Sequence, residues 1–133
     1  MTPGEIIRPP EWRAPAGYAH GVSATGRMIF TAGQIGWNPV TGEFETDNFA
    51  DQAAQALRNV VAVLKAAGAA PEHLVRLTWF VTNRDEYLRT TREVGAKYRE
   101  IVGRHYPAMS VIVVSALVEA RALVEIEATA VVP

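Results

Sequence analysis

Cysteine is absent from the 133-residue chain. Disulfide bonds, thiolate catalysis and zinc sites with cysteine ligands are therefore excluded. No apolar run reaches the roughly 18–20 residues that a membrane-spanning helix needs, so no membrane partner is expected. The first fifteen residues, MTPGEIIRPPEWRAP, lack a basic stretch followed by an apolar one, so no signal peptide is expected either. These absences favour a cytoplasmic location.

Charge of either sign is not in excess, because the formal net charge is −1. No global field attracts nucleic acid or anionic lipid, so neither partner is expected. The arginines between positions 84 and 92 alternate with Asp85, Glu86 and Glu93, which is typical of a solvated helix face.

Metal and nucleotide motifs are also missing. His20, His73 and His105 do not have the spacing of metal ligands, and no carboxylate cluster accompanies them. Gly33 and Gly36 do not form a dinucleotide fingerprint or a phosphate-binding loop. The sequence therefore predicts no metal site and no nucleotide site.

Hydrophobic residues make up 49% of the chain, which indicates one ordered domain over residues 1–133. Residues 1–16 contain several prolines and are expected to form an extended arm. Strands are predicted at 18–23 and 27–33, joined as a hairpin by the turn ATGR. A helix follows, capped by Asp47 or Asn48 and ended by Gly68.

The second half of the chain repeats the alternation of strand and helix. A strand rich in β-formers covers residues 73–83, and one helix is predicted from a cap at Asn83 to a stop near Gly103. Two strands, 109–117 and 123–132, complete the order β-β-α-β-α-β-β. The pattern predicts an α+β fold in which two helices cover one face of a single mixed sheet.

The two predicted helices leave apolar strand surface uncovered. VIVV at residues 111–114 is apolar on both sides, and the odd positions from Val75 to Val81 are apolar on one. An apolar face of this kind indicates a homo-oligomer whose sheets pack together.

The last strand, LVEIEATAVV, places two carboxylates on one face. Glu125 and Glu127 alternate with Val124, Ile126 and Ala128, so their Cα atoms lie roughly 6.5–7 Å apart. A partly buried carboxylate beside a like charge is suited to hold or move a proton. The same pattern fits a solvent-facing polar strip, or ion pairs with Arg76 or Arg121.

The aromatic residues are interpreted as packing residues before any binding role is considered. Trp37 and Trp79 are typical of core or interface anchors, and Tyr18 by itself is typical of packing. Tyr18 and His20 are two residues apart on the predicted first strand and share a face.

Seven short motifs occur in the order found in the RidA/YjgF family: GYAHGV, FTAGQIG, NPVTGEF, QAAQALRNVVAVLKAAGA, VRLTWFVTN, PAMS and LVEIEATAVV. They cover nearly the whole chain, which therefore resembles that family. The resemblance implies a chorismate-mutase-like fold, a homotrimer with sheets packed inward, and three clefts between subunits. It also implies a reaction without a cofactor, the hydrolysis of reactive enamines and imines to ketone and ammonia.

The resemblance also assigns residues to the cleft. Glu125 matches the glutamate that places the attacking water, and Tyr18 matches a cleft tyrosine. Gly33 and Gln34 match a loop, although Ala32 replaces its serine. Met109 stands where the family has an arginine that clamps the substrate carboxylate, and a thioether cannot form that ion pair.

Two hypotheses follow from the resemblance. In the first, the chain deaminates a small enamine or imine other than the usual 2-imino acid. Glu125 then orients water, the backbone near Gly33 and Ala108 holds the polar end, and Met109, Tyr18 and Trp37 form an apolar wall. Arg13 or Arg27 is a candidate substitute for the missing clamp. In the second, the protein is a non-catalytic trimer that binds a small molecule. Family members described as ribonucleases suggest a third activity, for which the sequence offers no basic stripe.

Overall fold

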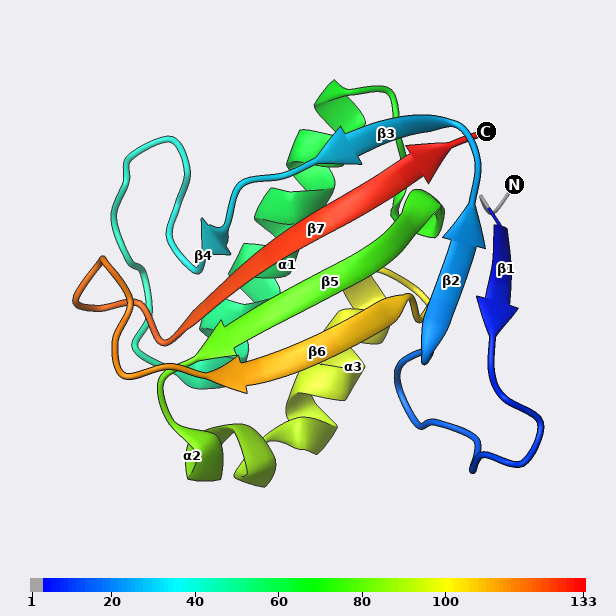
Figure 1. The fold of residues 1–133 in the computed structure, drawn as a ribbon. Coiled ribbons are helices and arrows are strands. Elements are labelled where there is room, and N and C mark those ends of the chain that lie inside the picture. The colour runs from blue at the N-terminus through cyan, green and yellow to red at the C-terminus, as the bar shows by residue number, and fades with distance from the viewer. Residues whose placement is uncertain (1–3) are drawn as a thin grey trace.

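The computed structural model describes residues 4–133, and its centre is a five-stranded mixed sheet (Figure 1). Strand β7 (Val124–Val132) pairs antiparallel with β3 (Arg27–Phe30), with the short β4 (Gln34–Ile35) and with β5 (Leu74–Val81). Strand β6 (Ala108–Val113) runs parallel to β5 at the edge. The predicted mixed sheet is confirmed.

Helices cover one face of this sheet. Helix α1 (Phe49–Ala66) lies behind β3, β7 and β5 in Figure 1, and α3 (Thr91–Ile101) lies behind β6. The core forms where Leu57, Val60 and Leu64 of α1 meet Ile126 and Ala130 of β7, all of them buried. The α+β class with helices on one face is therefore confirmed.

The predicted helix boundaries depend on capping residues, and most are confirmed. The Asn48 side chain accepts a hydrogen bond from the Asp51 amide at 3.0 Å, so Asn48 rather than Asp47 caps α1. Gly68 follows α1 with φ of 77°, a value that favours glycine. A short 3-10 helix, Pro71–His73, then leads into β5.

The single helix predicted after Asn83 is wrong, because the structure has two. Helix α2 (Arg84–Arg89) ends before Thr90, and α3 begins at Thr91. The Thr90 hydroxyl donates to the Glu86 carbonyl at 2.8 Å, and such side-chain bonds compete with helix continuation. Three helices rather than two thus accompany the sheet.

The predicted hairpin of the first two strands is also wrong. Strand β2 (Gly21–Ala24) pairs with β1 (Gly4–Ile7) in a separate two-stranded sheet, whereas β3 pairs with β7. Gly26 is required for another reason, since a Cβ there would overlap the Val132 carbonyl. Long-range pairing with β7 buries Ile29 and outweighs the local turn signal.

The predicted extended arm over 1–16 differs as well. Its described part contains β1 and then turns back at Pro9, whose carbonyl accepts from the Trp12 amide at 3.1 Å. Residues 1–3 lie outside the described range. The strand predicted at 109–117 ends earlier, at Val113.

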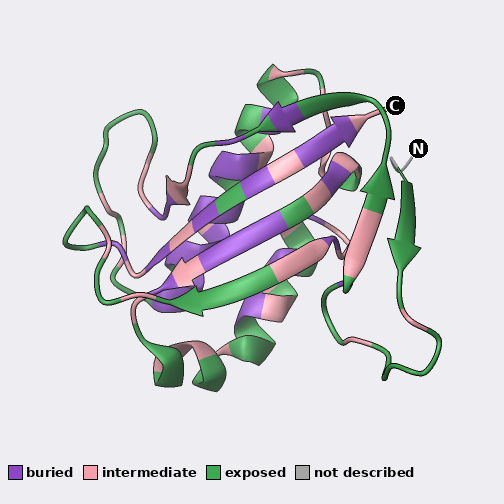
Figure 2. Ribbon diagram, viewed as in Figure 1, coloured by how far each residue is buried: buried purple, intermediate pink, exposed green. Residues whose placement is uncertain are grey.

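The sheet face away from the helices remains open. Phe30 and Met28 of β3 are 68% and 58% exposed on it, and Ile112 of β6 is also exposed. Figure 2 shows this exposure along β3 and β6, at the two sides of the buried central strands. Ile112 belongs to the VIVV segment, for which uncovered apolar surface was predicted. The same prediction for the odd positions of β5 is wrong, because Leu77, Trp79 and Val81 are buried on the helix side.

Two buried amide side chains of α1 hold the loops at one end of the sheet. Gln52 donates to the carbonyls of Thr46 and Arg121 at 3.0 and 3.1 Å, and accepts from the Leu123 amide at 2.9 Å. Asn59 donates to the carbonyls of Ile35 and Trp37 at 3.1 and 3.0 Å. These hydrogen bonds fix the position of the start of β7, and of β4 and the loop that follows it, relative to α1.

A Gln52→Ala substitution is expected to lower the free energy of unfolding by about 2–3 kcal/mol, because three backbone groups lose a buried partner. Urea denaturation measures the change. Arg58→Ala, at an exposed position of the same helix, is the control. Equal stability of the two variants would contradict this role of Gln52.

Candidate functional site

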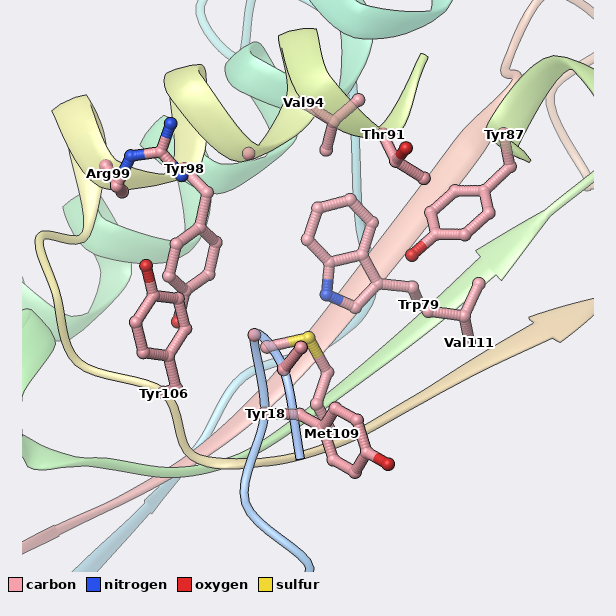
Figure 3. A pocket seen from close by; sticks show the side chains of 13 residues that line it. Tyr18, Trp79, Tyr87, Thr91, Val94, Tyr98, Arg99, Tyr106, Met109 and Val111 are labelled. Carbon is pink, nitrogen blue, oxygen red and sulfur yellow. The ribbon is translucent and has the colours of Figure 1, made fainter. Parts of the chain in front are cut away.

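A cavity of about 560 Å³ lies on the helix side of β6, between this strand and helices α2 and α3 (Figure 3). Its lining comes from the loop before β2, strands β5 and β6, helices α2 and α3, and the turn before β6. The side chains that form most of the wall are Tyr18, Trp79, Tyr87, Val94, Tyr98, Arg99, Tyr106, Met109 and Val111.

Strand register explains why Met109 faces this cavity. Met109 is opposite Leu77 and Val111 is opposite Trp79 in the parallel pairing of β6 with β5. Partners in a parallel ladder point to the same face, so both β6 residues turn toward the helices with Leu77 and Trp79. Ala108, next to Met109, points to the opposite face.

The aromatic wall is neutral. The Tyr98 hydroxyl donates to the His105 carbonyl at 2.6 Å, and the Tyr98 ring stacks on Tyr106 with centroids 5.4 Å apart. Burial raises the pKa of Tyr98, with a smaller effect from Tyr106, and burial also raises the pKa of Tyr87. These phenols therefore remain protonated at neutral pH.

The loop before β2 closes one side of the cavity with Tyr18. The Ala19 amide donates to the Pro107 carbonyl at 3.0 Å, which fixes the loop beside the start of β6. The Tyr18 ring meets His20 edge-on at 5.3 Å. Of the predicted site residues, the structure thus brings Tyr18 and Met109 together, with the Ala108 backbone beside them.

Glu125 belongs to a second group of residues, on the open face of the sheet. A Cβ placed on Gly33 would overlap the Glu125 carboxylate, so the Gly33 backbone lies directly against it. Thr31 holds this loop, because its amide donates to the Ala128 carbonyl at 2.9 Å and its hydroxyl accepts from the Ala128 amide at 3.0 Å. Gln34 follows in β4, opposite Ile126.

An extra residue in the loop brings Gly33 over Glu125. From Phe30 to Gln34 the chain makes four steps, whereas their partners Thr129 and Ile126 on β7 are three steps apart. This local mismatch has the form of a β-bulge, which redirects the backbone beside a ladder. The absence of a side chain at Gly33 then permits the close approach.

The two glutamates of β7 differ in environment. Glu125 is half-buried opposite Phe80, whereas Glu127 is exposed opposite Thr78. Arg121 instead binds Asp47, with 2.7 Å between Nη2 and Oδ1. Within residues 4–133, no ion pair joins either glutamate to Arg76 or Arg121.

The sheet separates the two groups of site residues. Met109 faces the helices, and Glu125 faces away from them, so neither side chain reaches the other within one chain. Trp37 belongs to neither group: its ring lies 5.9 Å from that of Phe44 in the loop after β4.

The arginines suggested as a clamp lie elsewhere, and a different one lines the cavity. Arg27 donates to the Ala67 carbonyl at 2.8 Å, at the end of α1. Arg13 lines a neighbouring hollow that shares Tyr18. Arg99 of α3 lines the main cavity, and sequence reasoning missed it. The signal was the spacing of four from Thr91 through Gly95 to Arg99, which places all three on one helix face.

Neither a group of metal ligands nor a membrane-spanning helix occurs within residues 4–133. No three His, Asp or Glu residues among 4–133 lie together as a group able to hold a metal ion. No helix in that range is both long and apolar enough to cross a membrane.

Comparison with known proteins covers almost the whole chain. Residues 10–132 match the family model described as Endoribonuclease L-PSP. The 2-iminobutanoate/2-iminopropanoate deaminase of Escherichia coli K12 is 40% identical over 117 residues, which are 86% of each protein.

Solved structures agree with this match. The Rid-family protein YyfB from Yersinia pestis superposes with a TM-score of 0.84 at 34% identity, covering 96% of this chain and 98% of that one. Escherichia coli TdcF with bound serine gives 0.69 at 32% identity, covering 99% and 94%. The chain therefore belongs to the RidA/YjgF family.

Proposed function

We propose that this protein hydrolyses a reactive enamine or imine of a small metabolite to a ketone and ammonia, in a cleft formed between subunits. The observation that carries the proposal is the placement of Glu125. Its carboxylate lies against the Gly33 backbone on an open sheet face, and no cation among residues 4–133 forms an ion pair with it. A relative 40% identical is named an imine deaminase, which supports the same chemistry.

Glu125 can perform the proton transfers that the hydrolysis requires. The carboxylate accepts a proton from water as the oxygen bonds to the imine carbon, and the imine nitrogen takes up a proton. The carboxylate then takes the hydroxyl proton of the carbinolamine and passes it to the nitrogen, so that the carbon–nitrogen bond breaks, the carbonyl forms and ammonia departs. The sum is imine plus water giving ketone plus ammonia. An enamine first takes up a proton at carbon to become the imine.

A trimer is part of this proposal, because one chain carries the two halves of the site on opposite faces of its sheet. A neighbouring subunit that packs its open face near the β6 edge brings its own Glu125 toward the Met109 cavity. The exposed Phe30 and Met28 supply apolar area for that contact. Homotrimer assembly thus accounts for both the open face and the divided site.

Met109 is the reason why we propose a substrate other than a 2-imino acid whose carboxylate is held by an arginine on the strand. The thioether provides an apolar, adaptable contact and no charge. Binding of a carboxylate at this position would leave the anion unpaired, which is costly in a partly closed site. The substrate is therefore a differently held imine.

The family model's description names an endoribonuclease, but we place deamination first. The chain carries a net charge of −1, so it has no surplus of cations for phosphates. RNA cleavage that persists at low salt and is abolished by Glu125→Gln would reverse this order.

Glu125→Gln is expected to reduce ammonia release from imines by about 10²–10⁴-fold, because the amide cannot accept the proton of water. Glu127→Gln is the matched control, two residues along the same face, and is expected to keep the wild-type rate. Turnover can be measured with imines generated in situ and an ammonia-coupled assay.

Undiminished ammonia release by Glu125→Gln would reject the assigned role. Ligand-dependent thermal shifts without turnover of any imine would instead identify a non-catalytic binding protein.

Met109→Arg is expected to create or raise activity on 2-imino acids, because a guanidinium at this strand position can hold a carboxylate bidentately. Met109→Leu is the control, since it keeps an apolar side chain. The comparison of kcat/KM on imines with and without a carboxylate measures the gain. An arginine variant no more selective for 2-imino acids than Met109→Leu would contradict the placement of Met109 in the cleft.

Phe30→Asp is expected to dissociate the trimer, because it places a charge in the apolar contact between open sheet faces. Val40→Asp, at a residue 91% exposed in the loop after β4, is the control and is expected to leave assembly unchanged. Light scattering gives the mass of each variant. A wild-type monomer, or a Phe30→Asp trimer, would argue against this interface.

A further inference from the structure

Among residues 4–133, Arg99 is the only charged side chain that lines the main cavity, and it does so at an exposed position on the rim. Within residues 4–133, no carboxylate forms an ion pair with the Arg99 guanidinium. The other lining side chains are aromatic, aliphatic or neutral and polar, and burial keeps Tyr98 and Tyr87 protonated. The cavity thus contains one unpaired cation among neutral walls.

Gly95 makes room for this cation. Side chains on a helix lean toward its N-terminus, so Arg99 extends over the residue four positions earlier. A Cβ on Gly95 would lie 3.4 Å from Arg99 Nη1, which means that the guanidinium occupies the space a longer side chain would fill. A glycine in a helix interior weakens the helix, and here it opens a place for Arg99.

Trp79 supplies a second unsatisfied group at the other side of the cavity. The residue is 3% exposed, and its indole nitrogen is buried without a hydrogen-bond partner. An indole N–H is a donor only, so the group that completes it must be an acceptor. Figure 3 shows this nitrogen turned toward Met109, whose flexible side chain is able to move aside for a ligand.

The Arg99 guanidinium and the Trp79 indole N–H lie apart in the cavity. In Figure 3, Arg99 extends from α3 at the upper left, the Trp79 indole lies to the right near Met109, and the Tyr98 ring lies between Arg99 and Met109. A ligand that meets both groups has an anion at one end, a neutral acceptor at the other, and a flat body that packs against the aromatic wall.

We propose that Arg99 has taken over the anchoring of the substrate's anion, and that the substrate is an imine whose carboxylate is separated from the reacting carbon by an aromatic or similarly flat body. This inference rests on the proposed deaminase function. The carboxylate binds Arg99 on α3, and the reacting end lies beside Met109 and the Trp79 N–H, where the partner subunit's face brings a glutamate. The ligand class differs from short 2-imino acids, in which the carboxylate adjoins the reacting carbon.

The test is binding of an unreactive product-like ketone, 4-acetylbenzoate, to the full chain by isothermal titration calorimetry. Wild type is expected to bind it about 10- to 100-fold more tightly than the uncharged 4-acetylbenzamide, as charge-assisted hydrogen bonds predict. Arg99→Gln is expected to remove this preference. Arg92→Gln, an exposed arginine on the same helix outside the cavity, is expected to keep it.

A second variant separates binding from folding. Gly95→Leu fills the space of the guanidinium and also removes a helix-interior glycine, so it is expected to lose the carboxylate preference without a lower thermal midpoint. The Trp79 indole N–H resonance in a ¹⁵N spectrum is expected to shift with 4-acetylbenzoate, and to shift less with 4-ethylbenzoate, which lacks the acceptor.

Equal binding of the acid and the amide by wild type, no binding of either, or an unchanged preference in Arg99→Gln would overturn the inference. These measurements involve no turnover, so they are independent of Glu125. An unchanged preference in Arg99→Gln together with lost turnover in Glu125→Gln leaves the deaminase proposal standing. A preference that depends on Arg99 supports the anchor even in a protein that turns over no imine.

Discussion

The alternation of side chains along β7 is the constraint on which the rest of the structure depends. Val124, Ile126 and Ala128 are buried against the helices, so the residues between them must face the other way. Glu125 is one of those residues, and its position therefore follows from core packing. A shift of one residue in the pairing of β7 would bury carboxylates among the side chains of α1. The hydrophobic core thus fixes the register of β7, and this register places the candidate catalytic group on the open face.

The alternation of side chains between the two faces of the sheet also places the Met109 cavity and Glu125 on opposite sides. Met109 faces the helices because it is in register with Leu77, and the sheet lies between it and Glu125. In our proposal, function at this site requires a second copy of the chain, whose open face carries exposed apolar residues. Assembly and catalysis are therefore coupled in our proposal: the contact that covers Phe30 also completes the cleft.

In our proposal, the cavity recognises the substrate's anion through a helix arginine in place of a strand arginine. Met109 offers no charge, whereas Arg99 approaches from α3 across the space left by Gly95. Moving a cation from a strand to the facing helix changes the distance between the anion and the reacting end of a ligand. An aromatic wall with two neutral tyrosines then favours a flat body between them. In our proposal, the position from which one guanidinium extends decides which substrate the same architecture accepts.

The sequence by itself determined the elements with strong periods: the apolar face and Gly68 stop of α1, the β5 strand, and the alternation that places Glu125 and Glu127 together. Local signals suffice for these, because side-chain period and capping are properties of neighbouring residues. The motif order also identified the family. Only the tertiary structure decided that β2 pairs with β1, that Thr90 divides a helix, and that Arg99 rather than Arg13 or Arg27 lines the cavity. These features depend on contacts between residues distant in sequence, whose energies no local pattern contains.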